Sequence, residues 1–315
     1  MVAEEIPDLE LLRKGGKLQL SRALSLLEQS PAKMLNLLND CYHAPRAQVV
    51  GVTGPPGVGK STLLAELIKS YRAEGRTVGV IAVDPSSKKS GGALLGDRVR
   101  FSTDPEDQGV FVRSMAARER LGGLADLTIA AMVLMRAVFD IVLIETVGVG
   151  QSETDVSGVT DTVVFCVQPG SGDSLQFMKA GIAEIPHIAL VTKADMGKAA
   201  ERTKADLRGA LSLSSEESSD WAVKVLALSS SDKTGLEGFM TAIDEHYTWL
   251  QSEGMLSVQR HQQAKQWLRE AVRDLFGRAG LSFLQNTELS LDKAGEISPF
   301  ELLSQVQQEL VISRR

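Results

Sequence analysis

The sequence predicts an α/β protein with a mostly parallel central sheet flanked by helices, plus helical extensions at both ends of the chain. Apolar runs rich in Val and Ile recur with helical segments between them. These runs are continuous rather than alternating, which is typical of strands covered on both faces and joined by crossover helices. The expected strands are Gln48–Thr53, Thr77–Asp84, Val110–Arg113, Asp140–Glu145, Thr162–Gln168, His187–Thr192 and Val223–Leu228. Ligands of such sheets bind at the carboxyl ends of the strands, so the functional residues are expected there.

The chain before the first run is predicted to be a helical N-terminal extension. Leucines and alanines between Leu9 and Leu38 recur with helical spacing, and the pattern is broken at Gly15-Gly16 and at Pro31. We place this extension at residues 1–45, ahead of a nucleotide-binding domain at 46–250.

A phosphate-binding pattern, G-x-x-x-x-G-K-[ST], directly follows the first run. It consists of Gly54, Pro55, Pro56, Gly57, Val58, Gly59, Lys60 and Ser61, with Thr62 as a further predicted contact. The glycines let backbone N–H groups surround a β-phosphate at the start of the next helix. Lys60 is expected to reach the β- and γ-phosphate oxygens, and Ser61 to coordinate Mg²⁺. The pattern therefore predicts a P-loop protein that binds a nucleoside triphosphate.

Two later strand ends bring acidic side chains to the same edge. Asp84 ends the second run and precedes a glycine-containing loop at 88–96, which we expect to order when a γ-phosphate is present. Asp84 is expected to hold a metal-bound water or to orient the attacking one, although a simple turn cap before Pro85 stays open. Glu145 ends the fourth run and is predicted to be the acid on the metal side, with the Gly148 N–H facing the γ-phosphate.

The choice of base is predicted from the segment Thr192-Lys193-Ala194-Asp195. A carboxylate at Asp195 can accept both the N1–H and the 2-amino group of guanine, whereas adenine has no matching pair of donors. Lys193 is expected to cover one face of the base. Three serines, Ser229, Ser230 and Ser231, are expected to close the other side. The segment favours GTP over ATP.

The chain after the last strand is predicted to be helical. Leu236–Leu250 forms one expected helix, and Val258–Phe276 carries an apolar stripe at helical spacing. Packing within the chain and a subunit interface explain this stripe equally well. We expect the helix to end at Gly277 and Gly280, and Ser298 to begin a terminal helix.

Composition limits the possible partners. A net charge of −6 argues against a general nucleic-acid-binding surface. The most apolar stretch, Ile129–Ile144, is interrupted by Arg136 and Asp140, so no membrane span is predicted. The N-terminus is acidic and resembles no targeting sequence, which favours a cytoplasmic protein. The two cysteines, Cys41 and Cys166, lie far apart, and Cys166 sits in an apolar run typical of a buried structural thiol.

These motifs together resemble the MeaB-type P-loop GTPases, a family also known as ArgK or LAO (arginine/ornithine) transport ATPases. The resemblance is carried by the phosphate loop, Asp84-Pro85-Ser86-Ser87, the block Glu145-Thr146-Val147-Gly148-Val149-Gly150-Gln151 and Lys193-Ala194-Asp195, in this order. It covers most of the chain. It implies a GTPase that is slow alone, is stimulated by a partner and acts as a chaperone of an adenosylcobalamin-dependent acyl-CoA mutase.

The resemblance also assigns residues and partners. It implies that Asp84 and Asp97 lie in or beside the first switch, that Glu145 opens the second, and that Gln176 and Lys179 sense the mutase. Mg²⁺ would be held by Ser61 with these acids, and adenosylcobalamin by the partner, since the chain has no D-x-H-x-x-G motif. A homodimer joined by residues 251–315 is implied, with the adenosyltransferase of the mutase as a further candidate partner.

Two positions depart from the family pattern. The base motif usually begins with Asn and here begins with Thr192, so an amide that ties the base to the phosphate loop is expected to be lost and nucleotide affinity to be weaker. A Ser-Ala pair appears here as Ser229-Ser230, which leaves the backbone contact possible.

Three other functions stay open. A metal-insertion GTPase is disfavoured by only 4 histidines and 2 cysteines, none of them clustered. A transport-associated ATPase or kinase is disfavoured by Asp195. A nucleotide-sensing adaptor requires that hydrolysis be absent even with the cognate partner. The identity of the client mutase, among methylmalonyl-, ethylmalonyl-, isobutyryl- and 2-hydroxyisobutyryl-CoA enzymes, is also left open.

Overall fold

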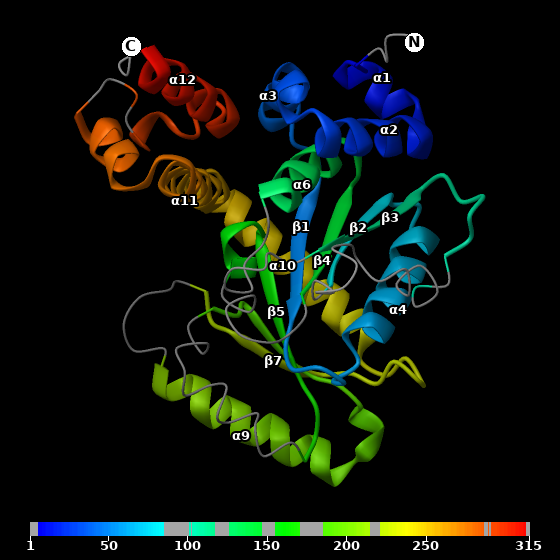
Figure 1. The fold of residues 1–315 in the computed structure, drawn as a ribbon. Helices are drawn as coiled ribbons and strands as arrows, with labels where there is room; N and C mark the ends of the chain where they lie inside the picture. The colour runs from blue at the N-terminus through cyan, green and yellow to red at the C-terminus, as the bar shows by residue number, and fades with distance from the viewer. Residues whose placement is uncertain are drawn as a thin grey trace, which may run out of the picture. The chain divides into compact units, whose positions relative to one another are not determined.

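The computed structural model describes residues 6–84, 101, 103–116, 126–146, 155–170, 185–214, 221–286, 289 and 291–312. These residues form a 7-stranded sheet in the order β3-β2-β4-β1-β5-β6-β7 (Figure 1). The strands are β1 Gln48–Thr53, β2 Val78–Asp84, β3 Val110–Ala116, β4 Ile141–Glu145, β5 Thr162–Val167, β6 Ile188–Val191 and β7 Lys224–Ala227. Every neighbouring pair is parallel, which confirms the predicted fold class.

Each predicted apolar run forms a strand, and the largest difference in length is at β3. The sequence predicts an end at Arg113, whereas the strand pairs with β2 as far as Ala116. β3 lies at the edge of the sheet. A strand there tolerates polar side chains because part of it faces solvent, so Arg113 and Ser114 do not end it.

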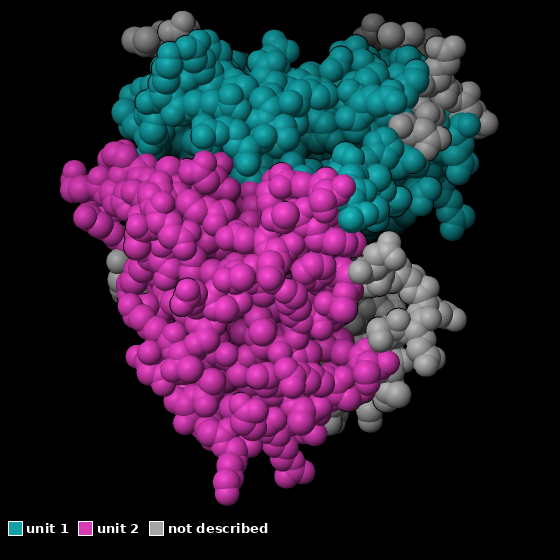
Figure 2. All heavy atoms as spheres, turned by 180° about the vertical axis from the view of Figure 1, so that it is seen from behind, with its two compact units in different colours: residues 1–47, 126–138, 253–315 teal, residues 48–125, 139–252 magenta. Residues whose placement is uncertain are grey.

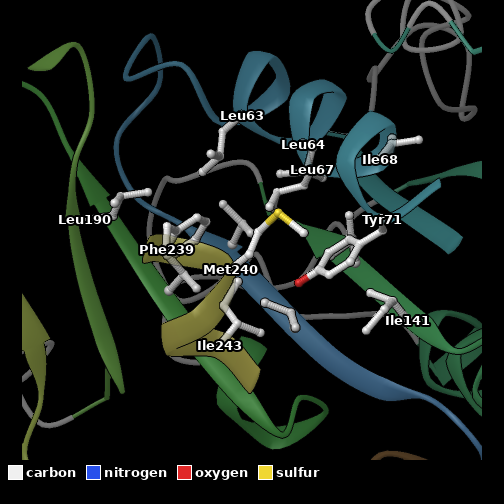
Figure 3. Packing of buried hydrophobic residues seen from close by; sticks show 14 of the residues in the cluster. Leu63, Leu64, Leu67, Ile68, Tyr71, Ile141, Leu190, Phe239, Met240 and Ile243 are labelled. Carbon is white, nitrogen blue, oxygen red and sulfur yellow. The ribbon is translucent and has the colours of Figure 1, made fainter. Parts of the chain in front are cut away.

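One face of the sheet is covered by α4 (Lys60–Ala73) and α10 (Leu236–Ser252). Leu63, Leu67 and Tyr71 of α4 are fully buried and share a cluster with Phe239 and Ile243 of α10. Figure 3 shows these side chains meeting over the strands. The spacing of four residues along α4 puts its apolar side chains on one stripe, so the helix that follows the phosphate loop is firmly held by the core.

The opposite face of β5 and β6 is covered by α9 (Lys198–Ser214). Leu207 and Leu211 of α9 pack with Phe165 and Val167 of β5. The intervening Cys166 belongs to the cluster on the α4 face. This alternation is the pattern expected for a strand covered on both sides.

The remaining described helices are α1 Leu9–Lys14, α2 Gly16–Gln29, η1 Pro31–Met34, α3 Leu35–His43, α6 Asp126–Val138, η2 Val156–Gly158, η4 Ala194–Met196, α11 Met255–Asn286, η5 Leu291–Lys293 and α12 Pro299–Ile312. The breaks predicted at Gly15 and Pro31 are confirmed. None of the helices in the described ranges combines the length and the hydropathy that a membrane-spanning helix requires.

The contacts divide the chain into two compact units (Figure 2). One unit comprises residues 1–47, 126–138 and 253–315, and it is helical. The other comprises residues 48–125 and 139–252 and contains the sheet. The domain boundaries at 45 and 250 stay a prediction.

Helix α11, which precedes the terminal helix α12, differs from the sequence prediction. Its backbone leaves helical dihedral angles at Gly277 (φ 63°, ψ −150°), but the helix resumes and runs to Asn286. Gly280 does not end it: a Cβ there would lie 2.5 Å from Cβ of Phe276, so this glycine permits close packing across the kink. Along the apolar stripe, Ala264, Leu268, Ala271 and Val272 are buried, whereas Val258 and Leu275 are 47% and 54% exposed.

Both cysteines are free and buried. Burial raises the pKa of Cys41 and of Cys166 to about 12. Because the thiolate is the reactive and metal-binding form, neither thiol is expected to react at neutral pH. This agrees with the interpretation of Cys166 as a structural thiol.

Two histidines are stacked at the amino ends of β5 and β6. The rings of His187 and His246 lie 4.1 Å apart, and His246 also contacts the rings of Trp221 and Trp249. The Thr162 hydroxyl lies 2.9 Å from Nδ1 of His246. Burial lowers the pKa of His187 to about 4 and, together with the charge of the neighbouring imidazole, lowers that of His246 to about 3.

We therefore expect the free energy of unfolding to fall as the pH drops from about 6.5 towards 4. In this window His187 and His246 bind protons in the unfolded chain, at the ordinary histidine pKa of about 6.5. In the folded chain these two side chains stay neutral. Each histidine contributes a slope of up to about 1.4 kcal/mol per pH unit. Urea unfolding of the wild type and of His246→Gln tests this: the variant should have the shallower slope, and equal slopes would contradict the assignment. His43→Gln, at an exposed position, is the control.

Candidate functional site

The phosphate loop runs from the end of β1 to the start of α4, as Figure 1 shows. Gly54, Gly57 and Gly59 have φ values of 134°, 79° and 99°, a region that favours glycine. A Cβ on Gly54 would lie 2.2 Å from the carbonyl oxygen of Cys166, whereas one on Gly57 or Gly59 would meet no atom within 4 Å. The first glycine therefore allows β1 and β5 to approach closely, and the other two border open space.

The side chain of Lys60 lies inside this loop. Its Nζ donates to the carbonyl oxygens of Gly54 and Pro55 at 2.7 and 3.1 Å. The residue is only 6% exposed. These carbonyls hold the ammonium group beside the turn of the loop, where the charge on a bound phosphate would be compensated.

Ser61 and Glu145 meet although they are far apart in the sequence. The Ser61 hydroxyl donates to Oε1 of Glu145 at 2.7 Å. Glu145 is 7% exposed and comes from the end of β4, which pairs with β1. A hydroxyl and a carboxylate are oxygen ligands of the kind that Mg²⁺ prefers, so this donor pair fits the metal predicted from the sequence.

Several predicted residues cannot be placed in the site. The backbone of Asp84 ends β2, but its side chain falls outside the described residues, as do Asp97, Gly148, Gln176 and Lys179. Their roles stay predictions. Pro56 and Thr62 are exposed, and their predicted part in binding stays a prediction as well.

Thr192 connects the base segment to the phosphate loop. Its hydroxyl lies 2.7 Å from the carbonyl oxygen of Val58 and 3.0 Å from that of Val167, and the residue is 3% exposed. The sequence predicts that replacing Asn by Thr loses this link. The structure shows that a link is present, made by a hydroxyl with one proton where an amide would supply two.

Lys193 and Asp195 occupy the exposed part of this segment. Lys193 has a positive φ of 55°, and its Nζ donates to Oε1 of Gln168 at 2.5 Å and to the carbonyl oxygen of Gly57 at 3.2 Å. The buried Ser229 hydroxyl donates to Oδ1 of Asp195 at 2.8 Å. Phosphate loop and base segment are therefore in direct contact. Gln168 follows β5, at one of the strand ends where the sequence places the functional residues, but the sequence assigned it no role; its contact with Lys193 gives it one.

The serine segment after β7 supports Asp195. Ser231 lies 2.8 Å from Ser229, hydroxyl to hydroxyl, and Ser230 between them is partly exposed. The backbone N–H of Ser229 donates to the carbonyl oxygen of Thr234 at 3.0 Å. This turn fixes one oxygen of the Asp195 carboxylate and leaves the exposed side chain able to accept from a ligand.

Thr192→Val removes the link between the base segment and the phosphate loop. We expect GDP and GTP to bind about 5- to 10-fold more weakly, and by the same factor, because one net hydrogen bond that supports the loop is lost. Titration calorimetry with both nucleotides measures the change. Thr192→Ser should retain most of the affinity, and a Val variant with wild-type affinity would show that the link is irrelevant to binding.

Comparisons with known proteins point to one family of GTPases. The profile of the family described as "Methylmalonyl Co-A mutase-associated GTPase MeaB" matches residues 20–280. A putative GTPase of Pyrococcus horikoshii is 37% identical over 96% of this chain and 97% of its own length. The mouse "Methylmalonic aciduria type A homolog, mitochondrial" is 36% identical over 71% of this chain and 55% of its own length.

Among solved structures, the "LAO/AO transport system kinase" is similar with a TM-score of 0.69 and 27% identity, and 96% of each chain is covered. The chain that carries the phosphate loop, Glu145 and Asp195 thus matches, over 96% of its length, a relative that is named a GTPase. This chain is a GTPase and belongs to the methylmalonyl-CoA mutase-associated (MeaB) family.

Proposed function

We propose that GTP hydrolysis by this protein gates the loading of intact adenosylcobalamin into an acyl-CoA mutase, or the removal of damaged cofactor from it. The observation that carries the proposal is the match of residues 20–280 to a family described by its association with methylmalonyl-CoA mutase. The mouse relative, named for methylmalonic aciduria, supports the same class of client. Adenosylcobalamin itself would be held by the mutase.

Within the nucleotide site, the chain's own residues would bind and orient the triphosphate. The loop amides and Lys60 would hold the phosphates, and Ser61 with Glu145 would hold Mg²⁺. The metal would neutralise charge between the β- and γ-phosphate oxygens. We propose that Asp84 and Asp97 complete this side of the site and that the Gly148 N–H contacts the γ-phosphate.

Recognition of guanine is proposed to rest on Asp195. Ser229 already donates to one of its oxygens, which holds the carboxylate in place. The stem of Lys193, held at its tip by Gln168 and Gly57, would cover one face of the base. Because phosphate loop and base segment touch each other, loss of either contact should weaken the whole site.

We propose that the partner accelerates hydrolysis through Gln176 and Lys179. A mutase can do so only if it binds one nucleotide state better than the other. We further propose a homodimer formed by the C-terminal segment. The exposed Val258 and Leu275 on α11 support a contact there, because they extend an apolar stripe that is otherwise buried. The adenosyltransferase is a second candidate partner, and the cytoplasm the proposed location.

Purified protein mixed with candidate mutases tests the proposal. We expect one of the methylmalonyl-, ethylmalonyl-, isobutyryl- or 2-hydroxyisobutyryl-CoA mutases to raise the rate of GTP hydrolysis and to bind differently in the GTP and GDP states. Pull-down with each nucleotide measures binding, and phosphate release measures the rate. If no mutase in this set binds in either state or changes the rate, the chaperone proposal is wrong, although the chain would still be a GTPase.

A further inference from the structure

A pair of buried hydroxyls joins the two strands that lead into the nucleotide site. Oγ1 of Thr146 donates to Oγ1 of Thr53 at 2.9 Å. Both residues are 1% exposed. Thr53 ends β1 directly before Gly54, and Thr146 directly follows Glu145, the last residue of β4. We infer that this hydroxyl pair positions Glu145 against Ser61 and so sets how strongly the nucleotide site holds magnesium. The inference rests on the proposed Mg²⁺-nucleotide site.

The pair acts through the backbone and not on the nucleotide. β1 and β4 are parallel, with Val52 opposite Glu145. The backbone N–H of Thr146 donates to the carbonyl oxygen of Val52 at 3.2 Å, so the ladder continues beyond the strand end. Because neighbouring residues of a strand point to opposite faces, Glu145 faces α4 and Ser61 while Thr146 faces away. The threonines are therefore positioning residues.

Burial explains why these hydroxyls fix one arrangement. The strand residues that share their face of the sheet, Val49, Val142 and Ile144, are apolar and fully buried. A hydroxyl in such a place costs free energy unless it is hydrogen-bonded, and valine would have nearly the same shape without this cost. A buried polar contact among apolar neighbours favours the one alignment of the strands that satisfies it.

Magnesium binding should be sensitive to this alignment. Mg²⁺ demands nearly ideal octahedral geometry with short ligand distances. If the end of β4 shifts relative to β1, Glu145 moves relative to Ser61, which begins α4 beyond the phosphate loop. Binding of GDP without magnesium does not use Glu145 and should be unaffected.

The test uses the full-length variants Thr146→Val, Thr53→Val, the double variant and Thr146→Ser. GDP affinity is measured by calorimetry with Mg²⁺ and with EDTA, and thermal unfolding is followed without nucleotide. Thr162→Val is the matched control, because Thr162 is also a fully buried threonine with a buried hydroxyl contact, to His246, at the other end of the sheet.

We expect each single valine variant to reduce the gain in GDP affinity on adding Mg²⁺ by about 5- to 10-fold. The double variant should lose no more than either single one, since one bond is removed in all three, and the serine variant should recover most of the gain. Thr162→Val should lower the melting temperature without changing the gain. The inference would be overturned if Thr53→Val and Thr146→Val both kept the wild-type gain in GDP affinity on adding Mg²⁺. It would also be overturned if Thr162→Val lost as much of this gain as they do. If the wild type binds no GDP, the proposed nucleotide site itself fails.

Discussion

Replacing Lys60 with alanine should reduce GTP hydrolysis by about 100- to 1,000-fold, the usual effect of removing one preorganised group that stabilises transition-state charge. In phosphoryl transfer, charge spreads over the oxygens of the γ-phosphate, and catalysis is almost entirely positioning and charge stabilisation. The Lys60 ammonium is already held inside the loop by the carbonyls of Gly54 and Pro55. Single-turnover phosphate release measures the loss.

Lys69→Ala is the matched control for this variant. Lys69 lies on the same helix, its side chain is 58% exposed and it pairs with Glu66 at 2.6 Å. Its loss should leave hydrolysis unchanged, because Lys69 itself is largely exposed, lies more than two helical turns from Lys60, and leaves Glu66 with Lys233 as a second partner at 3.6 Å. If the Lys60→Ala variant hydrolysed GTP at more than about a tenth of the wild-type rate, the role assigned to Lys60 would be wrong.

The candidate residues whose positions in the fold follow from the sequence are those at fixed offsets in its motifs. The phosphate loop, Glu145 and Asp195 each follow an apolar run, and parallel strands bring their carboxyl ends to one edge of a sheet. Ser61 and Glu145 were both expected at the Mg²⁺ site, so their proximity could be expected from the two motifs. The same argument applies to the seven strands, whose apolar runs all became part of one sheet.

Contacts between distant segments could not be predicted in this way. The effect of Thr192 was judged from the missing amide alone, because nothing in the sequence places its hydroxyl 2.7 Å from Val58, 134 positions away. Thr53 and Thr146 are 93 positions apart, and their pairing depends on β1 and β4 being neighbours. Gly280 was predicted to end the helix. Its actual role, a close approach to Phe276, depends on the kink at Gly277, which the sequence does not show.

Asp195→Asn should convert the preference for guanine into one for xanthine. The carboxylate would accept from the N1–H and the 2-amino group of guanine, and each such bond to a charged group contributes about 1.5–3 kcal/mol. An asparagine amide offers one acceptor and one donor, so it opposes the 2-amino group but matches the 2-oxo group of xanthine. GDP should bind at least about 100-fold more weakly to the variant, and xanthosine diphosphate more tightly than GDP.

The contacts of Asp195 allow this substitution without a change in the fold. Asp195 is exposed, and its oxygen that accepts from Ser229 can be replaced by the amide oxygen of asparagine, so the fold should be preserved. Asp206→Asn, an exposed position on α9, makes the same chemical change away from the site and should alter neither affinity. Competition calorimetry with GDP, ADP and xanthosine diphosphate separates the outcomes. If the Asp195 variant kept wild-type affinity for GDP, base recognition would have to lie elsewhere, and the choice of GTP over ATP would lose its physical basis in this segment.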